Sequence, residues 1–188
     1  MGTGATCLKP AADYLIGGVE LSETQVEAVR ESWALVLANP AGPNQVGVIA
    51  FKGLFKSAPE TFKLFDSFNT IENWQESRQY HHHCAVVVKI IGYIVKVLKD
   101  PELLEKNMDY MGMRHSMFEI HPHHFEILGQ ELVNAFGEIL GEEFTPAARE
   151  AWALVYTAIS NRLQAHLESY NKEFDYERIK DRDALTVT

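Results

Sequence analysis

The segment HHHCAVVVKIIGYIVKVL, residues 81–98, establishes which type of secondary structure dominates this chain. Its apolar side chains recur every three or four residues, which is the spacing of one face of an α-helix. No segment of the chain combines strict apolar–polar alternation with hairpin turn signals. We therefore predict an all-α protein, with one long helix over about residues 72–99.

Capping signals predict the other helices. Ser22 with Gln25 forms a capping box that opens a helix ending before Asn39. A second helix is expected over about 44–57, followed by a helical turn at Pro59. Phe62, Phe65 and Phe68 then fall in a loop or 3₁₀ corner. Three further helices are expected to begin at prolines, namely at Asp100-Pro101, at Pro122 and at Thr145-Pro146.

Length and composition define the class of protein. The chain has 188 residues, 46% of them hydrophobic and 23% charged, which is typical of one soluble globular domain. Its net charge of −9 argues against nucleic acid as a partner and against electrostatic attraction to anionic lipid. We see no apolar run of membrane length and no secretory signal. The two cysteines, Cys7 and Cys84, make no disulfide framework and suggest a reducing compartment.

The two ends of the chain differ from its middle. Residues 1–20 contain four glycines and Pro10 and are expected to form a flexible extension. Residues 171–188 carry nine charged side chains in eighteen positions, so we expect a frayed helix end or disorder there. Residues 21–170 remain as the folded domain.

The eight histidines are clustered and are the candidate ligands. His81, His82 and His83 lie on one helix, where successive side chains diverge by about 100°, so they cannot bind one ion together. His82 belongs to the more polar face, and periodicity leaves both His81 and His83 possible. Each of these two is either a buried ligand or an ordinary core histidine.

Of the five remaining histidines, His166 lies among polar residues of the last helix and needs no explanation, and the other four fall into two groups. His115 lies on an apolar stripe with Met108 and Met111, where it is either a buried ligand or a core histidine. His121, His123 and His124 flank Pro122 at a helix start. They could form a surface metal site, although helix capping is the interpretation we favour.

Enzyme motifs are missing from the sequence. It has no Gly-x-Ser-x-Gly elbow, no glycine-rich phosphate loop and no His-Glu-x-x-His. Cys84 lies within a predicted helix with no oxyanion site indicated, so a small buried cysteine is a better interpretation than a nucleophile. Whether the protein is an enzyme stays open.

The segment from Leu21 to about Tyr170 resembles a globin. Phe65 follows Pro59 by six residues, as in that family, and Trp33 matches a position in its first helix. His115 follows His83 by 32 residues, which matches the distal-to-proximal spacing and selects His83 over its neighbours. The resemblance also rests on Val87, Gly92, the run MGMRH at 111–115, Phe125 and the run FTPAAREAW at 144–152.

The resemblance is strongest to the neuroglobin and globin X branch. The Phe-Thr-Pro-Ala run, the Gly-x-Arg-His motif and Phe51 at a distal-pocket position point to that branch. Two features depart from it. Val86 stands where many relatives carry a basic residue near the haem propionates, and the corner cysteines of neuroglobin are absent.

The resemblance implies a globin fold, with about eight helices in a three-over-three sandwich around haem b. His115 would be the fixed iron ligand, with its other ring nitrogen donating to a backbone carbonyl one turn back. His83 would bind the sixth position reversibly, and Phe65 would pack flat on the porphyrin. The other pocket residues implied are Phe51, Phe68, Val86, Val87, Met111, Ile120, Phe125 and Leu128.

This branch implies redox or ligand chemistry with O₂, NO, CO or nitrite as the leading function, with a reductase or electron-transfer partner that the sequence does not identify. The alternatives are an oxygen carrier or store, a nitric oxide dioxygenase or nitrite reductase, and a haem-free helical signalling module. We expect no nucleic-acid partner.

The first residues look like an acylation signal. Gly2 and Thr6 fit the N-myristoylation pattern, and Cys7 could take palmitate. Globin X has a similar lipidated start. Because one myristoyl chain binds membranes only weakly and Lys9 is the only nearby basic residue, stable anchoring would need Cys7 as well. The expected location is the cytoplasmic face of the plasma membrane, or the cytoplasm without acylation.

Overall fold

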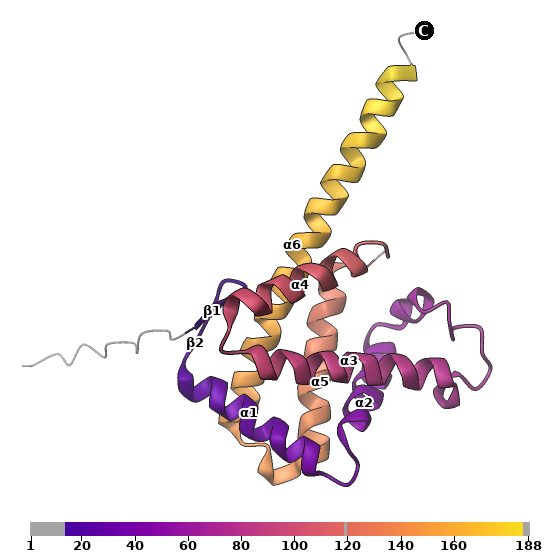
Figure 1. Cartoon of the computed structure of the whole chain (residues 1–188). Coiled ribbons are helices and arrows are strands. Elements are labelled where there is room, and N and C mark those ends of the chain that lie inside the picture. The colour runs from indigo at the N-terminus through magenta and orange to yellow at the C-terminus, as the bar shows by residue number, and fades with distance from the viewer. Residues whose placement is uncertain (1–13, 119, 186–188) are drawn as a thin grey trace, which may run out of the picture.

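Six α-helices and three short 3₁₀ helices make up most of the described chain, which covers residues 14–118 and 120–185 of a computed structural model, with side-chain surroundings described up to Ser169 (Figure 1). The all-α prediction is confirmed. The elements are α1 Glu23–Ala38, α2 Pro43–Ser57, η1 Pro59–Leu64, η2 Trp74–Glu76, α3 Arg78–Val97, α4 Pro101–His115, α5 Pro122–Leu140, η3 Gly141–Glu143 and α6 Pro146–Leu185.

Side-chain caps determine where these helices begin. Both bonds of the predicted capping box are present at the start of α1, with the Ser22 backbone N–H donating to Gln25 Oε1 at 2.9 Å. Asp100 Oδ1 accepts from the backbone N–H of Leu103 at 3.0 Å and caps α4. Ser77 caps α3, which therefore begins at Arg78 and not near residue 72 as predicted. The preceding residues form η2 instead.

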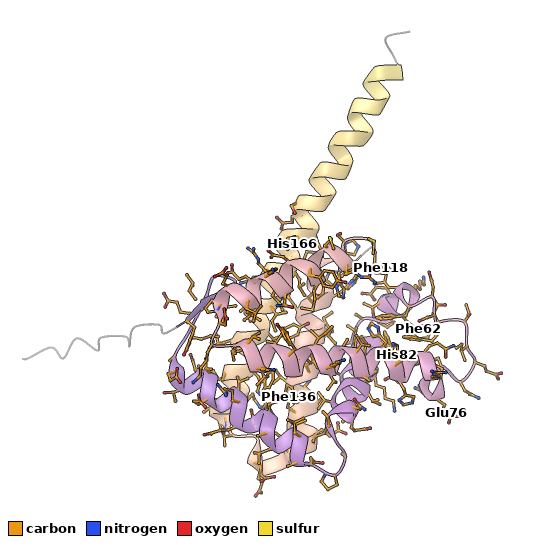
Figure 2. The ribbon with its side chains drawn as sticks, in the orientation of Figure 1. Phe62, Glu76, His82, Phe118, Phe136 and His166 are labelled. Atoms are coloured by element: carbon orange, nitrogen blue, oxygen red, sulfur yellow. The ribbon has the colours of Figure 1, made fainter. Side chains whose placement is uncertain are left out.

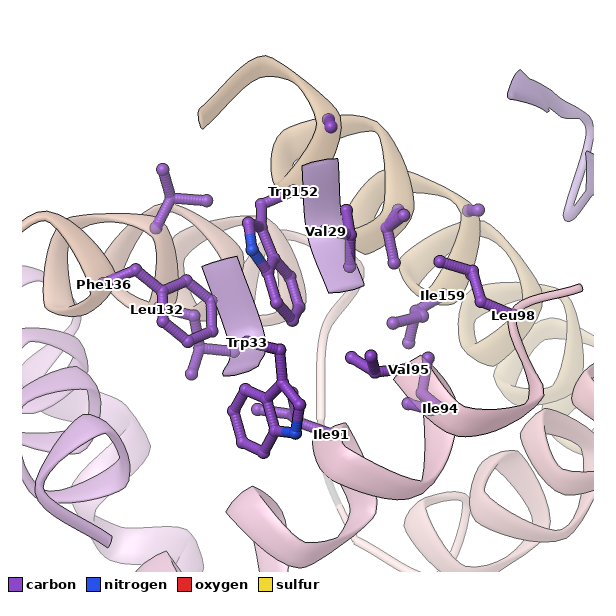
Figure 3. Packing of buried hydrophobic residues seen from close by; sticks show 14 of the residues in the cluster. Val29, Trp33, Ile91, Ile94, Val95, Leu98, Leu132, Phe136, Trp152 and Ile159 are labelled. Carbon is purple, nitrogen blue, oxygen red and sulfur yellow. The ribbon is translucent and has the colours of Figure 1, made fainter. Parts of the chain in front are cut away.

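The main core lies where α1, α3, α5 and α6 meet (Figure 3). Phe136 of α5 and Trp152 of α6 have ring centroids 4.3 Å apart, and Trp33 of α1 lies 6.2 Å from Trp152. The indole N–H of Trp152 donates to Ser32 Oγ at 2.8 Å, so this buried donor has a partner. The remaining space is filled by aliphatic side chains, among them Val29, Ile91, Ile94, Val95, Leu98, Leu132 and Ile159.

A short β-hairpin precedes α1, where the sequence suggested only a flexible extension. Strands β1 Tyr14–Ile16 and β2 Val19–Leu21 pair antiparallel across a two-residue turn. Gly17 and Gly18 both have positive φ, 54° and 77°, which glycine adopts without strain. Ile16 and Leu21 are buried in the main core. The Gly-Gly turn signal was present in the sequence, but three-residue strands are too short to show alternation.

The last helix extends far beyond the folded body. Helix α6 is continuous to Leu185, and its C-terminal part projects away from the other helices (Figure 1). The charged segment after residue 170 thus continues the backbone of α6 as far as the structure describes it. Within the described residues, no helix is both long and apolar enough to cross a membrane.

Candidate functional site

A cavity of about 360 Å³ opens between the corner after α2 and the facing ends of α3, α4 and α5. Its volume lies in the range of small-molecule and cofactor sites. The walls are mostly apolar, with three histidines from three different helices. The lining residues are Phe51, Leu54, Thr61, Leu64, Phe65, Asp66, Ser67, His83, Val87, His115, Phe118, Ile120, His124, Phe125 and Leu128.

His115 ends α4 and points one ring nitrogen back at its own helix. Its Nδ1 lies 2.8 Å from the carbonyl oxygen of Met111, one turn earlier. A carbonyl can only accept, so Nδ1 carries a proton, and in the neutral ring the lone pair is on Nε2. Since a metal-binding imidazole commonly donates its other N–H in this way, His115 is prepared as a ligand through Nε2. This is the hydrogen bond that the resemblance predicts.

His83 is the histidine of α3 that faces the cavity. Its ring meets the edges of Phe51 and Phe65, with centroid distances of 4.9 and 5.1 Å and interplanar angles of 81° and 77°. Burial, with smaller contributions from His115 and His82, lowers the pKa of His83 to about 4. The imidazole is therefore neutral at pH 7 and has a lone pair available to a metal.

The other two histidines of the run, His81 and His82, are both exposed. Periodicity left His81 and His83 open, and the structure decides for His83 because helix α3 turns that side chain alone among the three toward the cavity. His82 lies on the outer surface near the corner (Figure 2).

A cluster of aromatic rings supports the corner side of the cavity. Phe62, labelled in Figure 2, packs on Trp74 at a centroid distance of 4.9 Å. Phe65 forms part of the wall and stacks on Phe68, with centroids 5.2 Å apart and planes at 23°. Phe68 is fully buried behind Phe65 and does not line the cavity, so its assignment as a pocket residue is corrected.

Two further predicted pocket residues do not line the cavity. Val86 is 40% exposed, because the 100° step along α3 that brings Val87 into the wall turns Val86 outward. The side chain of Met111 packs partly buried against the main core, so Met111 contributes its carbonyl oxygen to His115 and not a wall contact. The other predicted wall residues are in place, namely Phe51, Phe65, Val87, Ile120, Phe125 and Leu128.

Several lining residues were not found from the sequence. Leu54 lies one turn after Phe51 on α2, and this spacing could have suggested it. Phe118 is 53% exposed, yet it borders the cavity beyond the end of α4 (Figure 2). Thr61, Leu64, Asp66, Ser67 and His124 are brought to the cavity by the irregular corner and by the first turn of α5, which no periodicity predicts.

The other sequence candidates have structural roles. Cys84 is fully buried, and burial raises the pKa of its thiol to about 11, so it is an unreactive core residue at pH 7 as interpreted. His124 accepts a hydrogen bond from the backbone N–H of His121 at 3.2 Å, which bears out the capping interpretation for these two residues. His166 of α6 pairs with Asp109 of α4, Nε2 to Oδ1, at 2.8 Å (Figure 2).

The charge distribution around the cavity fits a largely apolar group with a metal centre. Of the described residues that line it, none is lysine or arginine. The basic residue that the resemblance led us to expect at position 86 therefore has no substitute among these lining residues. A mainly helical fold thus brings His83 and His115 to one apolar cavity, and their ring nitrogens could bind the metal of a cofactor there.

Comparison with known proteins identifies the family. The sequence profile of the globin family matches residues 48–163, which is more than half of the chain. The chain is 29% identical over 145 residues to neuroglobin of Tetraodon nigroviridis, covering 74% of this chain and 88% of that protein. It is 26% identical over 140 residues to cytoglobin-2 of Danio rerio, covering 74% and 78%.

The fold agrees with this assignment. A solved structure described as a hexacoordinated heme protein from an anhydrobiotic tardigrade superposes with a TM-score of 0.71 over 79% of this chain and 96% of that chain, at 15% identity. The chain belongs to the globin family. The cavity fits the haem expected of a globin in its apolar walls and in the ring nitrogens that His115 and His83 offer.

Proposed function

We propose that this globin holds haem b between His115 and His83, and that both histidines bind the iron in the absence of an external ligand. The observation that carries the proposal is the neutral, partly buried His83 ring, in contact with Phe51 and Phe65 in the same cavity as His115. The similarity to neuroglobin, to cytoglobin-2 and to the hexacoordinated heme protein of the tardigrade supports the same arrangement.

Each part of the pocket has a separate task. Haem b supplies an iron atom that binds diatomic gases and exchanges an electron. His115 would hold the cofactor, because its Nδ1–H donates a hydrogen bond to the Met111 carbonyl and leaves Nε2 to bind the iron. The aromatic walls exclude water, which protects the reduced state from oxidation.

His83 regulates access. Because it would occupy the sixth position, it has to leave before a gas binds, and the apparent affinity falls by the fraction of protein in which it has left. Its two aromatic neighbours favour the inward orientation, and its neutral state means that no proton has to be removed first. Gas binding is therefore expected to be limited by departure of His83.

The test is the visible spectrum of the ferrous protein with and without carbon monoxide. We expect the sharp, split bands of low-spin bis-imidazole haem without the gas. His83→Leu should give a five-coordinate, high-spin spectrum and faster carbon monoxide binding. His82→Leu is the matched control, since His82 is exposed on the same helix, and should leave the spectrum unchanged. A high-spin wild-type spectrum would overturn the proposal.

The physiological role that we propose is redox or ligand chemistry with diatomic gases or nitrite, including electron transfer and protection from oxidants. It requires an external reductase or electron-transfer partner. An oxygen carrier or store is the second candidate, and it would show fast reversible oxygen binding and a five-coordinate ferrous form. Sustained turnover of nitric oxide or nitrite with a supplied electron donor would favour the dioxygenase or nitrite reductase alternative. A purified chain without a Soret band would favour the haem-free signalling module.

We also propose that the protein is held at a membrane by acyl chains on Gly2 and Cys7, both of which lie outside the described residues. The sequence pattern at Gly2 and the weak membrane affinity of a single chain support a double modification. In cells with an N-myristoyltransferase, wild type should sediment with membranes, Gly2→Ala should be soluble and Cys7→Ser intermediate. Equal membrane fractions of wild type and Gly2→Ala would contradict this location.

A further inference from the structure

A second group of potential ligands lies where the corner meets the start of α5. Glu60 comes from η1, and His123 and His124 come from the first turn of α5. One ligand atom from each of the three lies within 4.8 Å of the others. His124 is 6% exposed, and its buried Nε2 has no hydrogen-bond partner. A buried polar atom without a partner is unusual and requires an explanation.

The short distances in this group are close to those of a metal site. Glu60 Oε1 lies 3.6 Å from His124 Nε2 and 3.8 Å from His123 Nε2, which is too long for good hydrogen bonds. Zinc binds nitrogen and oxygen at about 2.0–2.2 Å, so neighbouring ligand atoms in a tetrahedral site lie about 3.4 Å apart. The ligand atoms of His123 and His124 lie within 4.8 Å of each other, so Glu60 and His123, whose side chains are 57% and 55% exposed, would turn toward His124 to complete the site.

We propose that Glu60, His123 and His124 form a binding site for a divalent transition metal, with Zn²⁺ as the ion that suits it best. Two imidazoles and one carboxylate make up three positions of a tetrahedral shell, and water would complete it. The donor set disfavours Mg²⁺ and Ca²⁺, which select oxygen ligands. The ion would be the partner that His124 Nε2 lacks.

The protonation of His124 is compatible with this role. Burial, with smaller contributions from His123 and His121, lowers the pKa of His124, so the ring is neutral at pH 7, as a metal ligand must be. Its Nδ1 accepts from the His121 backbone N–H, which places the proton of the neutral ring on Nε2. Zinc binding releases that proton, Nδ1 takes one up, and the 3.2 Å bond from His121 is lost. Because the backbone N–H of His121 then loses its acceptor, this change weakens zinc binding by about 5- to 150-fold.

The site would connect two elements that both border the haem cavity. His124 lines the cavity, and Thr61, the neighbour of Glu60, does as well. No continuous helix joins η1 to α5, so a shared ion would link them directly and stabilise that wall. The metal would thus act at a place distinct from the histidines that we assign to the iron.

The test is a titration of the haem-loaded, full-length protein with Zn²⁺, measured by isothermal titration calorimetry. We expect one site of defined stoichiometry, at least tenfold weaker in Glu60→Gln and in His123→Ala. Both residues are exposed, so these variants should fold normally. His82→Ala removes an exposed histidine elsewhere and should bind like wild type. Zn²⁺ should also raise the unfolding temperature of wild type and not of the two cluster variants, and Mg²⁺ should do neither.

Unchanged affinity in Glu60→Gln and His123→Ala, or loss of binding in His82→Ala, would overturn the site. This result is independent of the proposed function, because zinc binding is measured by heat and stability, whereas coordination by His83 is measured from the visible spectrum. A protein that binds Zn²⁺ at the cluster but has a five-coordinate ferrous spectrum would keep the metal site and reject hexacoordination.

Discussion

The main core and the haem cavity differ in how completely the chain fills them. In the core, the void that Ile91, Phe136 and Trp152 help to line is about 10 Å³, room for one water at most, whereas the cavity beside the corner measures about 360 Å³. In the core the buried Trp152 N–H has Ser32 as its partner. On the cavity side His124 Nε2 has none, and the Nε2 of His115 is left free. The side chains of the core fill its space and pair its buried indole N–H, whereas the cavity side has empty space and ring nitrogens open to a ligand.

Removing His115, the residue that we assign as the fixed iron ligand, should have the largest effect on haem binding. His115→Ala is expected to lose haem almost completely, because it removes the ligand that every state of the iron keeps. The measurement is the ratio of Soret to protein absorbance after purification. His166→Ala, which removes another histidine near α4, should retain haem. Full haem content and an unchanged spectrum in His115→Ala would show that the proximal residue lies elsewhere.

Truncating one aromatic ring in each region should separate packing from ligand binding. Phe136→Ala removes a ring that is 1% exposed from the filled core and should lower the free energy of unfolding by about 3–5 kcal/mol, with or without haem. Phe65→Ala enlarges an existing cavity, so it should cost less in the haem-free protein but speed haem loss from the loaded one. Denaturant unfolding and haem transfer to an apo-globin acceptor measure the two effects. Equal losses of stability in the two haem-free variants would contradict the comparison.

The next largest effect is expected at the hydrogen-bonded pair of the core, Ser32 and Trp152, and it concerns the free energy of unfolding. Ser32→Ala leaves the buried indole N–H of Trp152 without a partner and should cost about 1–3 kcal/mol of unfolding free energy. Thr157→Ala is the control. Both hydroxyls donate to a carbonyl of their own helix, Ser32 to Ala28 and Thr157 to Ala153, but Thr157 is exposed. We expect a change within about 0.5 kcal/mol for that variant. If both variants lost the same stability, the Ser32–Trp152 bond would have no special role.

The smallest effect is expected where α4 meets α6 at the surface. Arg162, and to a lesser degree His166, lower the pKa of Asp109, which accepts from Arg162 at 2.7 and 3.2 Å. A carboxylate whose folded pKa is lowered stabilises the fold above its unfolded pKa of about 3.9, and this contribution is lost as pH falls further. Since the pair is about 40% exposed at Asp109, Asp109→Asn should cost below about 1 kcal/mol at pH 7. Thermal unfolding of both proteins from pH 7 to pH 3 should show their difference shrinking.

Local signals in the sequence predicted most of the helices and their starts. Ser22, Asp100, Pro122 and Pro146 mark helix starts, because capping and proline geometry depend on a few neighbouring residues. Irregular segments were predicted less well. The start of α3 was misplaced, since Ser77 as a cap competes with a helical pattern that extends upstream. The β1–β2 hairpin was missed because its stability comes from burying Ile16 and Leu21 against distant helices.

For the site, the sequence by itself made His81 and His83 on α3 and His115 at the end of α4 candidate ligands or core histidines, and the resemblance to globins selected His83 and His115 as ligands. Only the tertiary structure decided which side chains form the walls. Val86 turns outward, Phe68 is hidden behind Phe65, and Met111 supplies a carbonyl, while Asp66, Phe118 and His124 reach the cavity from the corner, the loop and α5. Helical periodicity states which face a residue shares, but not what that face meets. That depends on where separate elements cross, and so does the meeting of Glu60 with His123 and His124.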